Sequence, residues 1–155
     1  MKTLSRKARY ALRALYALAD DPGHGPVLIA DLAAREKIPH KFLELILLEL
    51  RNAGILRSKK GKGGGYALAR APGEVTLGQV IRVVDGPLAP IPCVSERAYA
   101  RCEECVSEAH CGTRMVMKEV RDAIAEILDG TTLADVCARM AKVGRGPGGH
   151  VTYGG

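Results

Sequence analysis

The sequence HKFLELILLELRNAGILRSKKGKGGGYALAR occupies residues 40–70 and carries the clearest structural pattern in the chain. Its first half repeats leucine and isoleucine at helical spacing, which predicts an amphipathic helix over residues 40–52 that ends at Gly54. Pro39 is suited to open this helix, because a residue in the first turn needs no backbone donor. A shorter amphipathic segment over residues 28–37 precedes it. Two short helices joined by a tight break are typical of a helix-turn-helix.

The second half of this stretch predicts a β-hairpin. Residues 55–58 and 66–69 are short β-compatible runs, and the segment KKGKGGG between them suits a flexible, charged tip. A hairpin directly after a helix-turn-helix predicts a winged helix. We therefore expect a mainly α fold with a small β-hairpin: a winged helix-turn-helix followed by a long C-terminal dimerisation helix.

Amphipathic patterns outside this stretch predict four more helices, over residues of about 4–20, 76–85, 113–128 and 131–141. Thr76 is a credible N-cap for the second of these. The predicted organisation begins with a winged helix-turn-helix domain over 1–86, whose N-terminal helix is also a candidate for the dimer interface. A cysteine-rich cofactor loop over 87–112 follows. The chain then continues with a dimerisation helix and a short terminal helix over 113–142, and ends with a disordered tail over 143–155.

Charge and hydropathy narrow the class of partner. The chain of 155 residues has 23 basic and 17 acidic residues, a formal net charge of +6, which favours an anionic partner. No apolar run approaches the roughly 18 residues of a membrane span. We therefore expect a cytoplasmic protein without membrane contact. In that reducing compartment, cysteines indicate metal binding or redox chemistry rather than structural disulfides.

Four of the five cysteines lie in the segment CVSERAYARCEECVSEAHC, residues 93–111, with the spacing C-x8-C-x2-C-x5-C. This loop is rich in charged and small residues, so it cannot order itself by burying apolar surface. Thiolates at such short separations bind iron–sulfur clusters or zinc. The sequence therefore predicts a metal site, with the ligand candidates Cys93, Cys102, Cys105 and Cys111. Cys137 lies in an apolar stretch and is expected to be a buried apolar residue.

The predicted long helix after the loop has an apolar stripe, formed by Val116, Val120, Ala123, Ile124 and Ile127. The stripe exceeds what so small a protein needs to close its own core, which predicts a homodimer seam. The alternative is that the helix packs back on its own domain.

Several motifs occur together: SRKARYAL near the N-terminus, LRNAGIL, KGKGGGYAL, TLGQVIRVVD, and the cysteine loop followed by GTR. In combination they resemble the IscR/NsrR/CymR family of winged-helix transcriptional regulators, over about residues 4–136. The resemblance implies a homodimeric repressor or activator with iron–sulfur clusters near the dimer interface. A two-fold dimer suits a palindromic operator in double-stranded DNA. Members of the family that lack the cysteines still bind DNA, so the fold and the sensing function are separable.

The resemblance places three cluster ligands at Cys93, Cys105 and Cys111. Two familiar fourth ligands are absent, because Arg114 stands in place of an IscR-like histidine and Ala8 in place of an NsrR-like carboxylate. Cys102 is the predicted replacement, with His110 and Glu104 as alternatives. The cofactor is expected to be a 2Fe–2S or 4Fe–4S cluster, with zinc or no metal as the other options.

We expect DNA contacts from three parts of the chain. In the second helix of the helix-turn-helix, Lys41 and Glu44 would face the major groove, where Glu44 can accept a hydrogen bond from a cytosine amino group. Phe42 either touches a thymine methyl group or belongs to the core. The remaining candidates are wing residues for the backbone or minor groove and a phosphate anchor near the N-terminus: Arg57, Lys59, Lys60, Lys62, Ser5 and Arg6.

The sequence thus predicts a transcriptional regulator that senses iron, redox state or nitric oxide through an iron–sulfur cluster. One alternative is a cluster-free regulator that responds through a disulfide or holds zinc, although the acidic neighbours Glu103 and Glu104 disfavour a reactive thiolate. A more remote alternative is a small redox enzyme. We expect no enzymatic activity, because GKGGG lies in a hairpin tip and does not open a helix as a phosphate-binding loop would.

Overall fold

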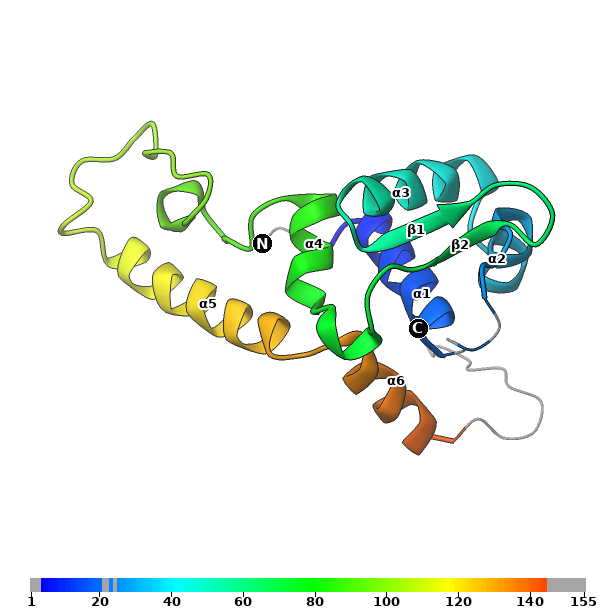
Figure 1. Cartoon of the computed structure of the whole chain (residues 1–155). Coiled ribbons are helices and arrows are strands. Elements are labelled where there is room, and N and C mark those ends of the chain that lie inside the picture. The colour runs from blue at the N-terminus through cyan, green and yellow to red at the C-terminus, as the bar shows by residue number, and fades with distance from the viewer. Residues whose placement is uncertain (1–3, 21–22, 24, 145–155) are drawn as a thin grey trace.

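The computed structural model describes residues 4–20, 23 and 25–144, and within them the chain is mainly helical with one small hairpin (Figure 1). The elements in chain order are α1 (Arg6–Asp20), α2 (Ile29–Glu36), α3 (His40–Asn52), β1 (Leu56–Lys59), β2 (Gly65–Leu68), the 3-10 turn η1 (Pro72–Glu74), α4 (Leu77–Asp85), the 3-10 turn η2 (Pro92–Val94), α5 (Gly112–Asp129) and α6 (Leu133–Lys142). The predicted fold class is confirmed. Most of the predicted tail, residues 145–155, lies outside the described residues.

Helix α1 is the centre of the core. It packs against α2, α3, α4 and α6, and its alanines let these helices approach closely. The apolar face of α3 closes the core on one side with side chains that are fully buried: Leu43, Ile46, Leu47 and Leu50. Because aromatic residues are scarce, aliphatic packing supplies almost all of the burial that holds these helices together.

The wing forms an isolated β-bridge with the segment before α2, which the sequence did not indicate. β1 pairs with β2 in antiparallel register from Leu56↔Leu68 to Lys59↔Gly65. Val27 and Tyr66 then exchange two backbone hydrogen bonds of 2.8 Å each, so the segment before α2 extends the sheet. Gly65 permits this contact, because a β-carbon there would lie 2.2 Å from the Val27 carbonyl oxygen.

The predicted strands, 55–58 and 66–69, each differ by one residue from the observed strands, Leu56–Lys59 and Gly65–Leu68. The first was expected to begin at Ile55, but it begins at Leu56. The reason is the end of α3, where Gly54 has a positive φ of 78° and the Ile55 N–H donates to the Leu50 carbonyl at 3.0 Å. Ile55 therefore belongs to the helix-terminating turn.

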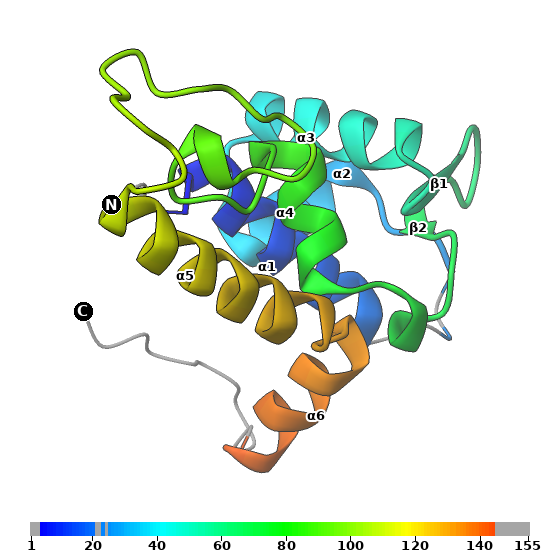
Figure 2. The ribbon, with the colours of Figure 1, turned by 90° about the vertical axis from the view of Figure 1, so that its left-hand side faces the viewer.

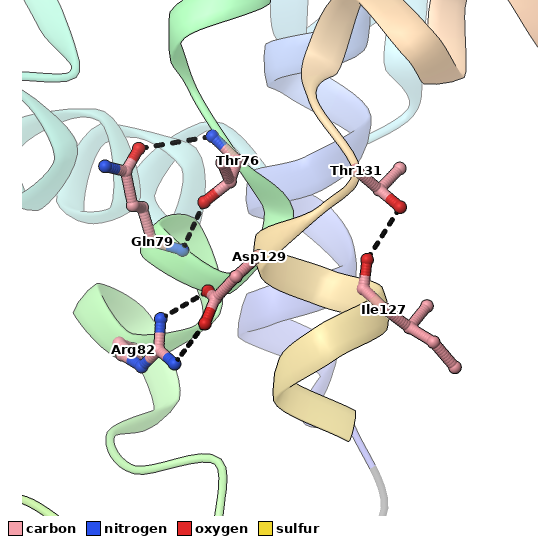
Figure 3. A network of polar contacts seen from close by, with 6 residues as sticks. All are labelled: Thr76, Gln79, Arg82, Ile127, Asp129 and Thr131. Atoms are coloured by element: carbon pink, nitrogen blue, oxygen red, sulfur yellow. Dashed lines mark hydrogen bonds and ion pairs between the residues drawn. The ribbon is translucent and has the colours of Figure 1, made fainter. Parts of the chain in front are cut away.

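Helix α4 begins as predicted at the N-cap Thr76, which forms a capping box with Gln79. The Thr76 hydroxyl accepts from the Gln79 N–H and the Gln79 amide oxygen from the Thr76 N–H, both at 3.2 Å (Figure 3). A second capping box joins Thr132 and Asp135 at the start of α6. These paired bonds satisfy backbone donors that the first turn leaves free.

Backbone hydrogen bonds join the start of α4 to the start of α6, and an ion pair beside them joins α4 to the end of α5. We call these contacts together the α4–α5 joint. The Leu77 N–H donates to the Thr131 carbonyl and the Leu133 N–H to the Val75 carbonyl, both at 2.9 Å. Beside them, Arg82 makes a two-pronged ion pair with Asp129 at 2.6 and 2.8 Å (Figure 3). The C-terminal end of α5 is thereby attached to the winged-helix body.

No residue of α5 is buried. Its apolar side chains include some that are more than half exposed: Met115, Val116 and Ile127. Figure 2 shows α5 along the near side of the molecule with α4 behind it, and the cysteine loop next to its N-terminal end. The chain's own domain therefore leaves much of the predicted stripe uncovered. Within the described ranges, no helix is both long and apolar enough to cross a membrane.

Candidate nucleic-acid interface and cysteine loop

The second helix of the helix-turn-helix, α3, presents one polar face to solvent. Lys41 and Glu44 are exposed, as predicted for groups that face the major groove. Phe42 is half-buried and packs edge-on against Tyr10, with ring centroids 5.5 Å apart. Its surroundings fit the core alternative, because a ring held against α1 is turned away from the exposed face.

Polar contacts hold α2 and α3 against α1. The Lys7 Nζ lies 2.5 Å from the Glu49 carboxylate, which joins α1 to α3. The Arg13 guanidinium donates to the Glu36 carbonyl at 3.0 Å, where α2 ends. These contacts fix the angle at which α3 stands on the body, and so the direction in which its exposed face points.

The hairpin carries a basic tip next to α3. Lys59, Lys60 and Lys62 are all exposed, and so is Arg57 on β1. Arg51 at the end of α3 extends this charge towards the wing and donates to the Ser58 hydroxyl at 3.4 Å. Arg51 was not among the DNA contacts that the sequence predicted. Its spacing of seven residues from Glu44, two helical turns, was the available signal.

The predicted phosphate anchor at the N-terminus is partly occupied within the chain. The Ser5 hydroxyl donates to the Asp85 carboxylate and accepts from the Ala8 N–H, and the Ser5 N–H donates to Asp85 at 3.1 Å. A phosphate at Ser5 would therefore meet the Asp85 carboxylate. Arg6 is exposed and stays a predicted phosphate contact.

The four cysteines of the loop occupy different environments. Cys93 is buried in η2, Cys102 is exposed, and Cys105 and Cys111 are half-buried. The Cys105 N–H donates to the Cys102 carbonyl at 3.0 Å, so these two share one turn. Among the described residues, no three or more His, Cys, Asp or Glu side chains are grouped so that they could hold a metal ion. The predicted gathering of four sulfurs is therefore not formed in this structure.

Both ends of the loop are fixed to α5. The Cys111 sulfur is the N-cap of α5 and accepts from the Arg114 N–H at 3.4 Å. The Arg114 side chain donates to the Cys93 carbonyl at 3.4 Å, and Arg121 donates to the Val94 carbonyl at 2.7 Å. Arg114 occupies the position where the resemblance implied a metal ligand. Its side chain bonds instead to the backbone carbonyl of Cys93.

Two further groups of the loop bond to each other within it. The Tyr99 hydroxyl donates to Glu108, and this bond raises the pKa of Tyr99. His110, an alternative fourth ligand, lies 3.0 Å from the Ser107 hydroxyl. His110 as placed therefore bonds to Ser107 within the loop.

The chemistry of the donor set suits a thiolate-bound metal centre, even though the sulfurs lie apart. Four thiols share one hydrophilic loop, and Cys111 stands at the N-cap of α5. Binding a cluster would require Cys93, Cys102, Cys105 and Cys111 to converge.

A family model for Rrf2, described as an iron-dependent transcriptional regulator, matches residues 4–139. The chain belongs to the Rrf2 family. Proteins of this family of transcriptional regulators bind DNA. The helix-turn-helix and the wing described above form the winged-helix fold of these regulators, as the sequence predicted.

Named relatives and solved structures agree with this family. The chain is 41% identical to a Rhodobacter capsulatus protein whose name describes it as rrf2-like, over 87% of this chain and 92% of that protein. The structure of CymR, the global cysteine regulator of B. subtilis, is 34% identical with a TM-score of 0.74 and covers 90% of this Rrf2-family chain and 98% of its own. The structure of T. potens IscR is 31% identical with a TM-score of 0.73, and it covers 95% of this chain and 94% of its own.

Proposed function

We propose that this Rrf2-family protein binds a palindromic operator in double-stranded DNA as a homodimer, and that an iron–sulfur cluster in the cysteine loop controls this binding. The DNA-binding part rests above all on one juxtaposition. Helix α3, on which Lys41 and Glu44 are exposed, lies next to the hairpin (Figure 1), and the hairpin tip carries three exposed lysines. Lysines at a flexible tip neutralise phosphates, while a helix face reads base edges.

The dimer is supported by the uncovered stripe of α5. Side chains such as Val116 and Ile127 are 53% and 66% exposed, and a second copy of α5 would remove them from water. A two-fold pair of winged helices matches the symmetry of a palindromic operator.

The cofactor proposal is supported by the donor set. Cys93, Cys102, Cys105 and Cys111 would supply the thiolate ligands, and an iron–sulfur cluster would supply a centre that responds to oxidants, to nitric oxide or to iron supply. Arg114 and Arg121 tie the backbone of residues 93 and 94 to α5. The position of the loop and the position of the proposed dimer helix are therefore coupled, and loop rearrangement would alter how the two winged helices are spaced.

The direct test is anaerobic purification of the full chain, with iron and sulfide analysis and visible spectra. We expect iron and sulfide in the wild type, loss of the absorbance in Cys102→Ser, and retention in the matched control Cys137→Ser, which changes a cysteine outside the loop. Operator affinity, on DNA selected from a random pool, should change when the cluster is removed. Protein that contains neither iron nor sulfide would refute the cofactor, and unchanged affinity would refute the control by the cluster.

A cluster-free thiol switch is the second candidate, and two observations favour it. The four loop cysteines form no disulfide with one another, and they are not gathered around one point. The chain also resembles Staphylococcus aureus CymR, for which a structure of an oxidized form is known, at 28% identity and a TM-score of 0.68 over 88% of this chain and 96% of that one. Mass spectrometry after mild peroxide decides this candidate: a new disulfide within the loop supports it, and none excludes it.

A further inference from the structure

The exposed face of α3 contains an apolar side chain that sequence reasoning did not assign to DNA. Residues at helical spacing on this face are Lys41, Glu44, Leu45, Leu48 and Asn52, all exposed. Leu45 is 64% exposed, although the other leucines and the isoleucine of the opposite face are completely buried. Leu45 is therefore a leucine that α3 does not need for the core. It directly follows Glu44, on the face that also carries Lys41.

The surroundings of Leu45 indicate a polyanion as the occupant of this face. Lys41 lies one turn before it, and the exposed Arg51 lies nearly two turns after it. The hairpin whose tip carries the exposed lysines packs against α3, and Arg51 bonds to Ser58 on its first strand. A purely apolar protein groove would be a poor match for this charge, whereas the major groove offers anionic rims and one apolar feature, the C5 methyl group of thymine.

We propose that Leu45 is a specificity-determining residue that contacts a thymine methyl group, in the role that the sequence offered to Phe42. Phe42 is held against Tyr10 and the core, which leaves Leu45 as the apolar group in the N-terminal half of α3. Recognition helices contact base edges mainly with that half. Since Glu44 is adjacent, the thymine should lie within about two base pairs of the cytosine that Glu44 reads.

This inference rests on the proposed DNA-binding function, and its test separates the two. The operator is first selected from random DNA with the full chain. Each thymine is then replaced singly by deoxyuridine, which lacks only the C5 methyl group, and affinity is measured by fluorescence anisotropy at fixed salt. One such replacement per half-site should weaken the wild type about fourfold, as expected for one buried methyl group.

The variants assign the methyl contact to a side chain. Leu45→Ala should lose sensitivity to that replacement, to less than about a twofold effect, whereas Leu45→Met should keep it. Leu48→Ala, one turn further from the N-terminal end of α3, is the matched control and should keep the full methyl dependence. Circular dichroism checks that the exposed substitutions leave the fold intact.

Each outcome has a distinct meaning. If no sequence is selected and no DNA is bound, the proposed function fails. If DNA is bound but no thymine is methyl-dependent, or if Leu45→Ala remains as sensitive as the wild type, the role of Leu45 is overturned while DNA binding stands.

Discussion

Gly65 permits the β-bridge that joins the wing to the segment before α2. Its φ of 133° and the short approach to the Val27 carbonyl leave no room for a β-carbon. The two backbone bonds between Val27 and Tyr66 depend on this approach. A single hydrogen atom as side chain thus permits a backbone contact near the tip end of the hairpin, where Gly65 pairs with Lys59.

We expect Gly65→Ala to lower the free energy of unfolding by about 1–3 kcal/mol, because it combines backbone strain with loss of the Val27–Tyr66 pair. Gly63→Ala is the control, since Gly63 also has a positive φ, 73°, but open space where the β-carbon would stand. Chemical denaturation should show the larger loss for Gly65→Ala. Equal losses would mean that the contact with Val27 contributes nothing beyond the φ requirement.

The arginine–carboxylate pair of the α4–α5 joint changes the titration of both groups. The hydrogen bonds between them lower the pKa of Asp129 and raise the pKa of Arg82. Because the folded-state pKa of Asp129 lies below its unfolded value, the pair stabilises the fold above about pH 4. That contribution disappears as the pH falls through the lowered pKa.

Asp129→Asn should therefore cost up to about 1 kcal/mol at pH 7, a value kept small because both side chains contact solvent. The difference between wild type and variant should shrink as the pH falls below about 4 and through the lowered pKa of Asp129. Urea denaturation over a series of acidic pH values measures it, and the double variant Arg82→Gln/Asp129→Asn supplies the coupling between the two residues. A difference that does not shrink as the pH falls would show that Asp129 acts through something other than its charge.

Periodicity in the sequence was sufficient to predict each of the six helices, because each has an apolar stripe with a clear period. It was insufficient where backbone geometry acts alone. Val27 joins the sheet through its backbone, which leaves no residue pattern, and Ile55 was assigned to a strand because the helix-ending turn at Gly54 uses β-compatible residues.

The candidate site was predicted unevenly for physical reasons. Exposed lysines at the wing tip follow directly from composition, but a leucine gives no direct signal of DNA contact, so the exposed Leu45 was not assigned one. The arrangement of the cysteine loop was beyond prediction from sequence, since little apolar burial fixes residues 96–104. Arg114 and Arg121 bond to the backbone of this loop, and such contacts have no sequence signature.

The proposed assembly can be tested on α5, whose stripe is exposed in the single chain. Val116→Glu should convert a dimer into a monomer without unfolding it, because the side chain is 53% exposed in the isolated subunit. Light scattering after gel filtration measures the mass. Operator affinity should fall by at least about tenfold, since the two half-sites would no longer be bound together.

Lys118→Glu, an exposed substitution outside the stripe, is the control and should leave the mass unchanged. A Val116→Glu variant that remains dimeric would place the seam elsewhere on the chain. Loss of helicity in the variant would instead indicate that α5 packs on its own domain.

The α4–α5 joint also gives α5 the geometry of a lever. The joint holds one end of a helix of 18 residues, about 27 Å long, and Cys111 stands at the other end. A tilt of about 10° around the joint therefore displaces Cys111 by about 5 Å, similar to the spacing of two paired strands. Residue 93 is carried along, because Arg114 of the same helix holds its carbonyl. A small rotation of α5 at Asp129 would thus move the cysteine loop by a larger distance, because the displacement grows with the length of the helix.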